Sequence, residues 1–289
     1  MPQEVTLVSG NMRLTIGLAF ACLSLNAATA LSEPGAPVSS DWVKGFDNQA
    51  RLVAGQAVRD GKTALYAGVE VAMPEGWKTY WRAPGDAGGV PPDFDWNASE
   101  NLQSADVLYP APHRLSDKAG DTVGYKGGVI FPVRVVPKDA TKPVVLRGKV
   151  EYGLCKDICI PAQADLKVVI PPNVGASAEL TDTLARVPQT SPRSGVDPKL
   201  DTWHFDPLAQ KPKLVLNVET SVPDKADAFV VAPGGIYVPL PKRVANASGK
   251  AVFEVDLSVD VDLKELKGKA LTVTMVDGKG QSETTITLK

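Results

Sequence analysis

The sequence predicts an all-β protein with two immunoglobulin-like antiparallel β-sandwich domains, joined by a linker rich in Pro, Gly and Ser that holds a short helix. Three observations support this fold class. Apolar and polar residues alternate in short runs along most of the chain, which is typical of half-buried strands. Pro and Gly turn signals separate these runs without helical periodicity between them, which favours an antiparallel sandwich over a parallel α/β sheet. The alternation stops between residues 171 and 201 and then resumes, which indicates two domains.

Residues 1–30 have the features of a secretory signal peptide. Met12 and Arg13 precede an apolar run from Leu14 to Leu25, and Ala28-Thr29-Ala30 offers small residues to signal peptidase. The apolar run of about a dozen residues is shorter than the roughly 20 that a membrane-spanning helix needs. We therefore expect an exported, periplasmic protein without a membrane span. A lipoprotein anchored through Cys22 is the alternative.

An N-terminal extension is expected at residues 31–50, loosely held, with Trp42 and Phe46 docked on the first domain. The first sandwich is expected at residues 51–172, where period-two alternation recurs between turn signals. Its inward-facing candidates are Leu65, Val69, Val71, Met73, Val129, Phe131, Val133, Val135, Val144, Leu146, Val150, Tyr152, Leu166, Val168 and Ile170.

The linker is expected at residues 173–203, with one helix from Ser177 to Arg186 that stops before Pro188. A second, smaller β-sandwich is expected at residues 204–289. Its strands are expected around Leu214 to Val218, Phe229 to Val231, Val252 to Leu257, Leu271 to Met275 and Thr285 to Leu288.

The composition excludes some classes of partner. The 289 residues carry a formal net charge of -2 and 22% charged residues. Because there is no surplus of Lys and Arg, we expect neither nucleic acid nor an anionic membrane surface as a partner.

Removal of Cys22 with the signal peptide would leave Cys155 and Cys159 as the only two cysteines, in a compartment that oxidises thiols. On one straight strand, residues four apart lie about 13 Å from each other. A disulfide needs Cα atoms within roughly 4.4–6.8 Å. Gly153 before the pair and Pro161 after it make a helix improbable. The pair therefore belongs to a tight turn that follows a strand ending near Tyr152.

Spacing alone leaves the role of the pair open. A disulfide that closes so small a loop adds little stability, and short-loop bridges at turns tend to be labile. A structural staple in an exported protein carries comparable weight on spacing. A soft-metal site is the third alternative, although His113 and His204 lie far from the cysteines in the sequence.

Three segments are more specific than the spacing. Residues 152–161, Tyr-Gly-Leu-Cys-Lys-Asp-Ile-Cys-Ile-Pro, resemble the redox segment of the N-terminal periplasmic domain of the thiol:disulfide interchange protein DsbD, and more closely that of its ScsB-like relatives. Gly76 to Arg82, followed by Pro84 to Gly88, is similar to the aromatic strand and turn of that domain. Gly124-Tyr125 and Phe131-Pro132-Val133 fit the strand before the redox hairpin. The resemblance covers approximately Val53 to Ile170, and the second domain fits the ScsB-like layout only in outline.

The resemblance implies an immunoglobulin-like domain that receives electrons from a membrane or thioredoxin-like donor and passes them to periplasmic disulfide oxidoreductases. Cys159 matches the cysteine that forms the mixed disulfide with partners, and Cys155 matches the cysteine that resolves it. Tyr80 lies where the family places an aromatic residue beside the cysteines. A cap loop that shields the pair would map near Leu115 to Val123. The multi-span membrane segment and the terminal thioredoxin-like domain of the full-length family are not in the sequence, so we expect a separate membrane partner of the CcdA/DsbD type.

Other residues near the pair have simpler interpretations. Lys156 and Asp157 are interpreted as solvated turn residues, Trp77 and Trp81 as sandwich packing, and Tyr152 as a buried strand residue. The sequence indicates no cofactor and no metal ligand set.

The leading functional prediction is a periplasmic thiol:disulfide relay, acting as a protein-disulfide reductase with thioredoxin-like oxidoreductases as partners. Two alternatives remain at this point. One is a periplasmic binding or scaffold module with a structural disulfide. The other is a copper-tolerance protein that binds Cu(I) through the thiolate pair.

Overall fold

The computed structural model describes residues 1–4, 35–118, 120–247 and 249–289. Every helix and strand given below lies in the unit Pro34–Lys289. The predicted signal peptide at residues 1–30 lies outside the described residues, apart from its first four. Within the described part of the chain, no helix has both the length and the apolar character needed to cross a membrane.

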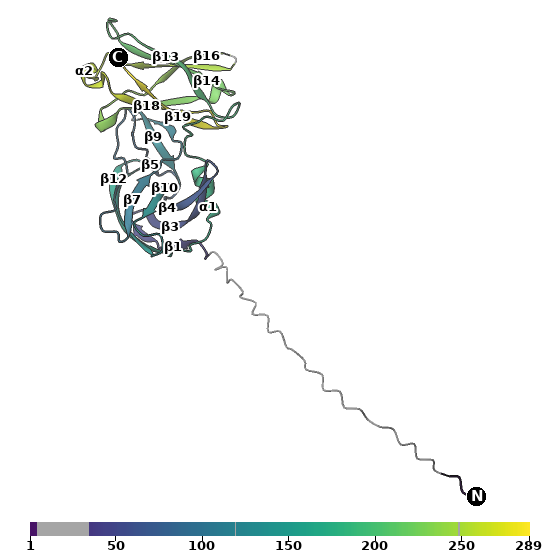
Figure 1. Ribbon diagram of the computed structural model, residues 1–289. Helices are drawn as coiled ribbons and strands as arrows, with labels where there is room; N and C mark the ends of the chain where they lie inside the picture. The colour runs from purple at the N-terminus through teal and green to yellow at the C-terminus, as the bar shows by residue number, and fades with distance from the viewer. Residues whose placement is uncertain (5–34, 119, 248) are drawn as a thin grey trace. The chain divides into compact units, whose positions relative to one another are not determined.

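Two antiparallel sheets form the first sandwich, as the alternation predicts (Figure 1). One sheet has the strand order β1-β3-β4-β10-β7 with β2 also paired to β3, and the other has the order β12-β11-β5-β9-β8 with β6 also paired to β11. The strands are β1 (Val38–Ser39), β2 (Val43–Gly45), β3 (Asn48–Arg59), β4 (Lys62–Ala72), β5 (Lys78–Tyr80), β6 (Asp93–Asp95), β7 (Leu102–Val107), β8 (His113–Asp117), β9 (Gly120–Lys126), β10 (Gly128–Pro137), β11 (Val144–Cys155) and β12 (Cys159–Ile170).

The inward-facing residues of both sheets form one core. Leu52, Val69, Phe131, Val133 and Leu146 are at most 1% exposed and belong to the same apolar cluster. Along β12 the pattern is strict, because Leu166, Val168 and Ile170 are buried while the residues between them are exposed. Burial of one face at period two fixes the register of the β11–β12 hairpin, since a slip by one residue would expose every apolar side chain.

The N-terminal extension differs from its prediction. We expected residues 31–50 to be loosely held, but β1 and β2 both pair with β3. The predicted docking of the two aromatics is present, because the Arg51 guanidinium lies 4.5 Å from the Trp42 ring centre and the Phe46 ring packs edge-on against Trp77. The extension is part of the first sandwich because its backbone completes the β3 edge.

The predicted linker helix is confirmed as α1 (Ala178–Leu184), which ends before Pro188. The Ser177 side chain accepts a hydrogen bond from the backbone N–H of Leu180 and so caps the first turn. Leu180, Leu184 and Val187 are buried against residues of β3 and β4. The linker is therefore packed on the first sandwich as far as Val187.

The second sandwich has a four-stranded sheet, β13-β14-β17-β16, and a three-stranded sheet, β15-β18-β19. It begins at Lys199, before the predicted boundary at residue 204. Its elements are β13 (Lys199–Phe205), β14 (Lys213–Glu219), the 3-10 helix η1 (Pro223–Lys225), β15 (Asp227–Val231), the 3-10 helix η2 (Pro233–Gly235), β16 (Lys242–Ala247), β17 (Lys250–Asp256), α2 (Leu263–Leu266), β18 (Ala270–Val276) and β19 (Gln281–Thr287). β13 and β16 were not predicted, because both are largely exposed edge strands without apolar alternation.

The two sandwiches contact each other within the unit Pro34–Lys289. Phe229 and Leu240 of the second sandwich belong to the apolar core cluster of the first. Arg114 forms a two-pronged ion pair with Asp227, at 2.7 and 3.0 Å, and Arg82 pairs with Glu283.

Candidate redox site

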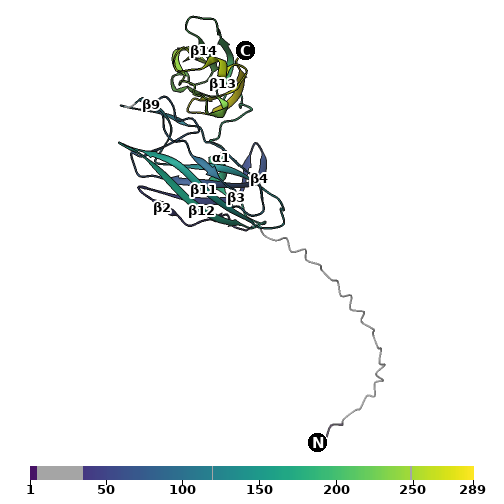
Figure 2. The ribbon, with the colours of Figure 1, turned by 90° about the vertical axis from the view of Figure 1, so that its left-hand side faces the viewer.

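The site lies at the tip of the β11–β12 hairpin, the long strand pair visible in Figure 2. Lys156, Asp157 and Ile158 form the turn, and the Lys156 N–H donates to the Ile158 carbonyl. Cys155 and Cys159 stand directly opposite each other across the antiparallel pair, with Cα atoms 4.2 Å apart, and a disulfide joins them. This spacing is close to the roughly 4.5 Å of a non-hydrogen-bonded pair. The predicted turn and bridge are confirmed.

The two cysteine residues differ in exposure. Cys155 is only 2% exposed because it ends the buried part of β11, whereas Cys159 begins β12 on the exposed side of the turn. Ile158, beside it, is 68% exposed. A thiolate of another protein can therefore reach Cys159 while Cys155 is shielded. Lys156 and Asp157 are exposed, which agrees with their interpretation as solvated turn residues.

Tyr80 contacts both sulfurs. It ends β5, which pairs with β11 through Leu154↔Thr79 and Cys155↔Lys78. The Tyr80 hydroxyl donates to Cys155 Sγ at 2.8 Å and lies 3.4 Å from Cys159 Sγ. Burial, and secondarily the negative charge of Asp117, raises the pKa of Tyr80. The hydroxyl therefore keeps its proton at neutral pH and remains a donor.

Gly89 and Gly153 form a slot for the Tyr80 ring, a role that the sequence analysis did not predict for either residue. A Cβ on Gly89 would overlap the ring, and a Cβ on Gly153 would lie 3.0 Å from Tyr80 Cε2. The Gly153 N–H donates to the Val90 carbonyl, so the loop around residue 89 is tied to β11. Gly153 lies in the quoted redox segment, residues 152–161, and Gly89 directly follows the quoted turn, Pro84 to Gly88.

The segment predicted to form a cap loop is part of a β-hairpin. Leu115 to Val123 fall in the β8–β9 hairpin, which continues the sheet through pairing of β9 with β5. The residue that lies on the Tyr80 ring is Gly89, and the next residue, Val90, is bonded to Gly153. A paired hairpin cannot swing away without loss of its ladder, whereas the residue 85–90 loop has few backbone hydrogen bonds.

Aromatic residues around the site have the expected packing role. Trp77, Trp81 and Tyr152 are buried members of the core cluster. The Tyr152 hydroxyl donates to Asn48 Oδ1 at 2.8 Å. They support the hairpin, and the hydrogen bonds to the sulfurs come from Tyr80.

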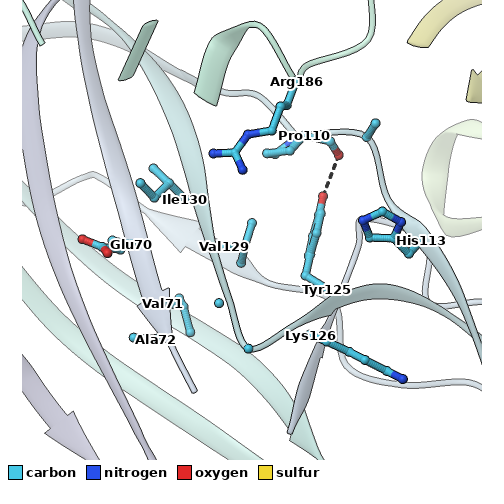
Figure 3. Close-up of a pocket in the computed structure, with 13 residues that line it drawn as sticks. Glu70, Val71, Ala72, Pro110, His113, Tyr125, Lys126, Val129, Ile130 and Arg186 are labelled. Carbon is cyan, nitrogen blue, oxygen red and sulfur yellow. Dashed lines mark hydrogen bonds between the residues drawn. The ribbon is translucent and has the colours of Figure 1, made fainter. Parts of the chain in front are cut away.

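A cavity of about 480 Å³ lies beside Tyr125 and Arg186 (Figure 3). Residues of β4, β9 and β10 line it together with His113 and Arg186, and no cysteine is among its lining residues. His113 and His204 are both exposed and neither contacts a sulfur. Among the described residues, no group of three or more His, Cys, Asp and Glu side chains is arranged to hold a metal ion.

Comparisons with known proteins agree with this geometry. Residues 49–171 match the family model of the thiol:disulfide interchange protein DsbD, N-terminal. The structure is similar to the crystal structure of the N-terminal periplasmic domain of ScsB from Proteus mirabilis, with a TM-score of 0.65 and 22% sequence identity, over 86% of this chain and 98% of that chain. No curated protein matches the chain. The predicted all-β fold is confirmed, and so is the resemblance to the DsbD and ScsB N-terminal domains.

Proposed function

Because residues 49–171 form a DsbD/ScsB-like N-terminal domain, we propose that the chain is a periplasmic thiol:disulfide interchange protein. In this proposal it is exported by the signal peptide at residues 1–30. It receives two electrons from a membrane donor of the CcdA/DsbD type or from a thioredoxin-like donor. It passes them to periplasmic thioredoxin-like oxidoreductases through Cys155 and Cys159.

The observation that carries the proposal is the asymmetry of the bridged pair. An exposed residue, Cys159, is joined through its sulfur to a residue that is 2% exposed, Cys155. A relay needs one sulfur that a partner can reach and a second one, shielded from the partner, that completes the exchange. This asymmetry supports Cys159 as the exchanging sulfur and Cys155 as its resolver.

The exchange balances without a cofactor. In the reduced protein, the Cys159 thiolate attacks a sulfur of the partner disulfide, and a Cys159–partner bond forms as the partner disulfide breaks. The Cys155 thiolate then attacks Cys159 Sγ, so the intramolecular bridge forms and the partner leaves as a dithiol. Two electrons pass to the partner, and the membrane donor returns the chain to the dithiol state.

A purely structural staple has less support. β11 and β12 already pair along their whole length, from Val144↔Ile170 to Cys155↔Cys159. A bridge across the last pair of this ladder closes a very small loop and therefore removes little conformational entropy from the unfolded chain. A staple would also have a midpoint potential below about -300 mV and would resist glutathione buffers.

The test is a trapping experiment with the chain that begins at residue 31. The reduced protein is mixed with an oxidised thioredoxin-fold protein that has one C-x-x-C bridge. We expect Cys155→Ala to accumulate a mixed disulfide through Cys159, and Cys159→Ala to form none. The double variant is the control for non-specific coupling. The proposal fails if both single variants reduce the probe as fast as the wild type.

A further inference from the structure

Asp86 connects the second sandwich to the loop that lies on Tyr80, the tyrosine beside the disulfide. Its carboxylate Oδ1 accepts a hydrogen bond from the Tyr237 hydroxyl at 2.9 Å and another from the Leu240 backbone N–H at 2.9 Å. Both donors lie in the segment between η2 and β16. Leu240 also packs in the apolar core cluster of the first sandwich. The segment is therefore attached to the first sandwich by apolar packing as well as by the hydrogen bonds to Asp86.

The same loop reaches the redox site at its other end. The Ala87 N–H donates to the Asp121 carbonyl at 3.0 Å, which holds the middle of the loop against β9. Gly89 lies directly on the Tyr80 ring, and the Val90 carbonyl accepts from Gly153 at 3.0 Å. The loop of residues 85–90 therefore runs from the second sandwich to the strand that carries Cys155.

We propose that Asp86 is a positioning residue for the redox pair, through which the second sandwich holds the residue 85–90 loop. The loop keeps the Tyr80 ring between Gly89 and Gly153, and the Tyr80 hydroxyl stabilises the thiolate that forms on Cys155. The second sandwich thereby has a defined task in the chemistry of the first. The inference deepens the proposed function and rests on it only for Cys159 being the attacked sulfur.

The chemical step shows where the tyrosine acts. When the thiolate of dithiothreitol attacks Cys159 Sγ, a bond to Cys159 forms, the Cys155–Cys159 bond breaks, and its electron pair goes to the Cys155 sulfur. The Tyr80 hydroxyl donates a hydrogen bond to this leaving thiolate without transferring its proton. The second thiol of dithiothreitol then releases Cys159 and forms the cyclic disulfide. A leaving thiolate that is better stabilised departs faster.

Tyr237 is suited to hold Asp86. Burial, and then the hydrogen bond and charge of Asp86, raise the pKa of Tyr237 to about 12. The phenol is therefore a donor at any pH at which the relay operates. The Asp86 carboxylate accepts from one side chain and one backbone group, which fixes its direction better than either bond alone.

The experiment measures the rate at which dithiothreitol reduces the Cys155–Cys159 bridge in the chain from residue 31 to residue 289. We expect Asp86→Ala to slow this rate by about threefold to tenfold, the effect of a partial loss of the Tyr80 hydrogen bond to the leaving thiolate. Asp86→Asn keeps an acceptor oxygen and should stay close to the wild type. Tyr237→Phe removes only one of the two donors and should give a smaller decrease, which also covers the case in which Asp86→Ala fails to fold.

Glu283→Gln is the matched control, because it weakens another contact between the sandwiches, the one with Arg82, without touching the loop. Its reduction rate should equal that of the wild type. The thiolate fraction of Cys155, followed by ultraviolet absorbance in the reduced Cys159→Ala background, should fall with Asp86→Ala and stay unchanged with Glu283→Gln.

A double-mutant cycle separates an effect of Asp86 on the position of Tyr80 from a general loosening of the fold. In the Tyr80→Phe background, Asp86→Ala should have no further effect on the reduction rate. The inference is overturned if Asp86→Ala leaves the rate unchanged, if it accelerates reduction, if its effect persists without the Tyr80 hydroxyl, or if Glu283→Gln slows the reaction equally. Because dithiothreitol is the reductant, these outcomes do not depend on exchange with protein partners, which the trapping experiment tests separately.

Discussion

The Tyr80 hydroxyl lies 2.8 Å from Cys155 Sγ and 3.4 Å from Cys159 Sγ, so one side chain contacts both ends of the disulfide. Tyr80 is 2% exposed, and burial raises its pKa. A protonated donor beside a sulfur stabilises the charged form of that sulfur more than the neutral form. The closer contact is with Cys155, the buried sulfur that becomes the leaving group when Cys159 is attacked.

Tyr80→Phe removes this donor and keeps the ring in its slot. We expect a lower thiolate fraction on Cys155 at a given pH and a reduction by dithiothreitol slower by about tenfold to a hundredfold, since hydrogen bonds to charged groups contribute about 1.5–3 kcal/mol. Stopped-flow kinetics and the ultraviolet absorbance of the thiolate measure the two effects. Tyr152→Phe is the control, because its hydroxyl donates to Asn48 and not to sulfur. Equal rates for Tyr80→Phe and the wild type would contradict the assignment.

Gly89→Ala should displace Tyr80, because the added Cβ would overlap the ring. We expect a loss of about 1–3 kcal/mol in the free energy of unfolding, typical of overpacking, together with slower reduction of the bridge. Urea unfolding and the dithiothreitol rate check the two effects. Gly88→Ala is a close control, since Gly88 also has a positive φ, but its Cβ would meet no atom within 4 Å. A change of the same size in the reduction rate of both variants would contradict the claim that Gly89 leaves room for the Tyr80 ring.

Asp227→Ala should weaken the attachment of the two sandwiches. Its carboxylate accepts both prongs of Arg114, and the two side chains are 23% and 20% exposed. We expect a loss of about 1–2 kcal/mol in the free energy of unfolding, since a charge-assisted, two-pronged pair is lost. Glu219→Ala breaks the Lys199–Glu219 pair, whose side chains are about half exposed, and should cost less than about 1 kcal/mol. Thermal unfolding of both variants compares the two effects. Equal losses in the free energy of unfolding would be evidence against a strong Arg114–Asp227 contact between the sandwiches.

Asp197 should make stability depend on pH in the acid range. Burial alone would raise the pKa of Asp197, but hydrogen bonds from the Arg193 side chain and backbone outweigh it, so the pKa is lowered. A lowered folded-state pKa means that the carboxylate stabilises the fold fully above its unfolded-state pKa of about 3.9. This contribution is lost as the pH falls through the folded-state pKa.

The corresponding variant is Asp197→Asn. We expect it to be less stable than the wild type at neutral pH, with a difference that shrinks as the pH falls below about 4. Urea unfolding over a pH series measures this. Asp201→Asn is the control, because the pKa of Asp201 is also lowered, by Lys250, but its carboxylate is exposed. A difference that grows with acidity would reverse the sign and refute the assignment.

Parts of the site could be predicted because they depend on local sequence. Gly153, Pro161 and the alternation on both sides of Cys155 and Cys159 excluded a helix and a straight strand, which left the hairpin turn that the structure has. The helix after Ser177 was predictable for the same reason, since its cap, its apolar spacing and Pro188 are neighbours in the chain.

Other parts depended on contacts between distant residues. The cap loop was predicted near Leu115 to Val123, but those residues pair into the β8–β9 hairpin. The loop that does lie on Tyr80 carries only Pro and Gly signals, which indicate a turn and not what it touches. The extension at residues 31–50 also lacked a strong local signal, because β1 and β2 are short and are stabilised by pairing with β3.

The sequence by itself determined the all-β class, the two sandwiches, the linker helix and the position of the cysteine pair on a turn, because periodicity, caps and turn residues act over a few neighbouring residues. Only the tertiary structure decided that Cys155 is buried while Cys159 is exposed, and that Tyr80, from 75 residues earlier, donates to the bridge. The physical reason is that β5 reaches β11 through sheet pairing, and Asp86 reaches Tyr237 through contact of two domains. Neither relationship leaves a pattern in the local sequence.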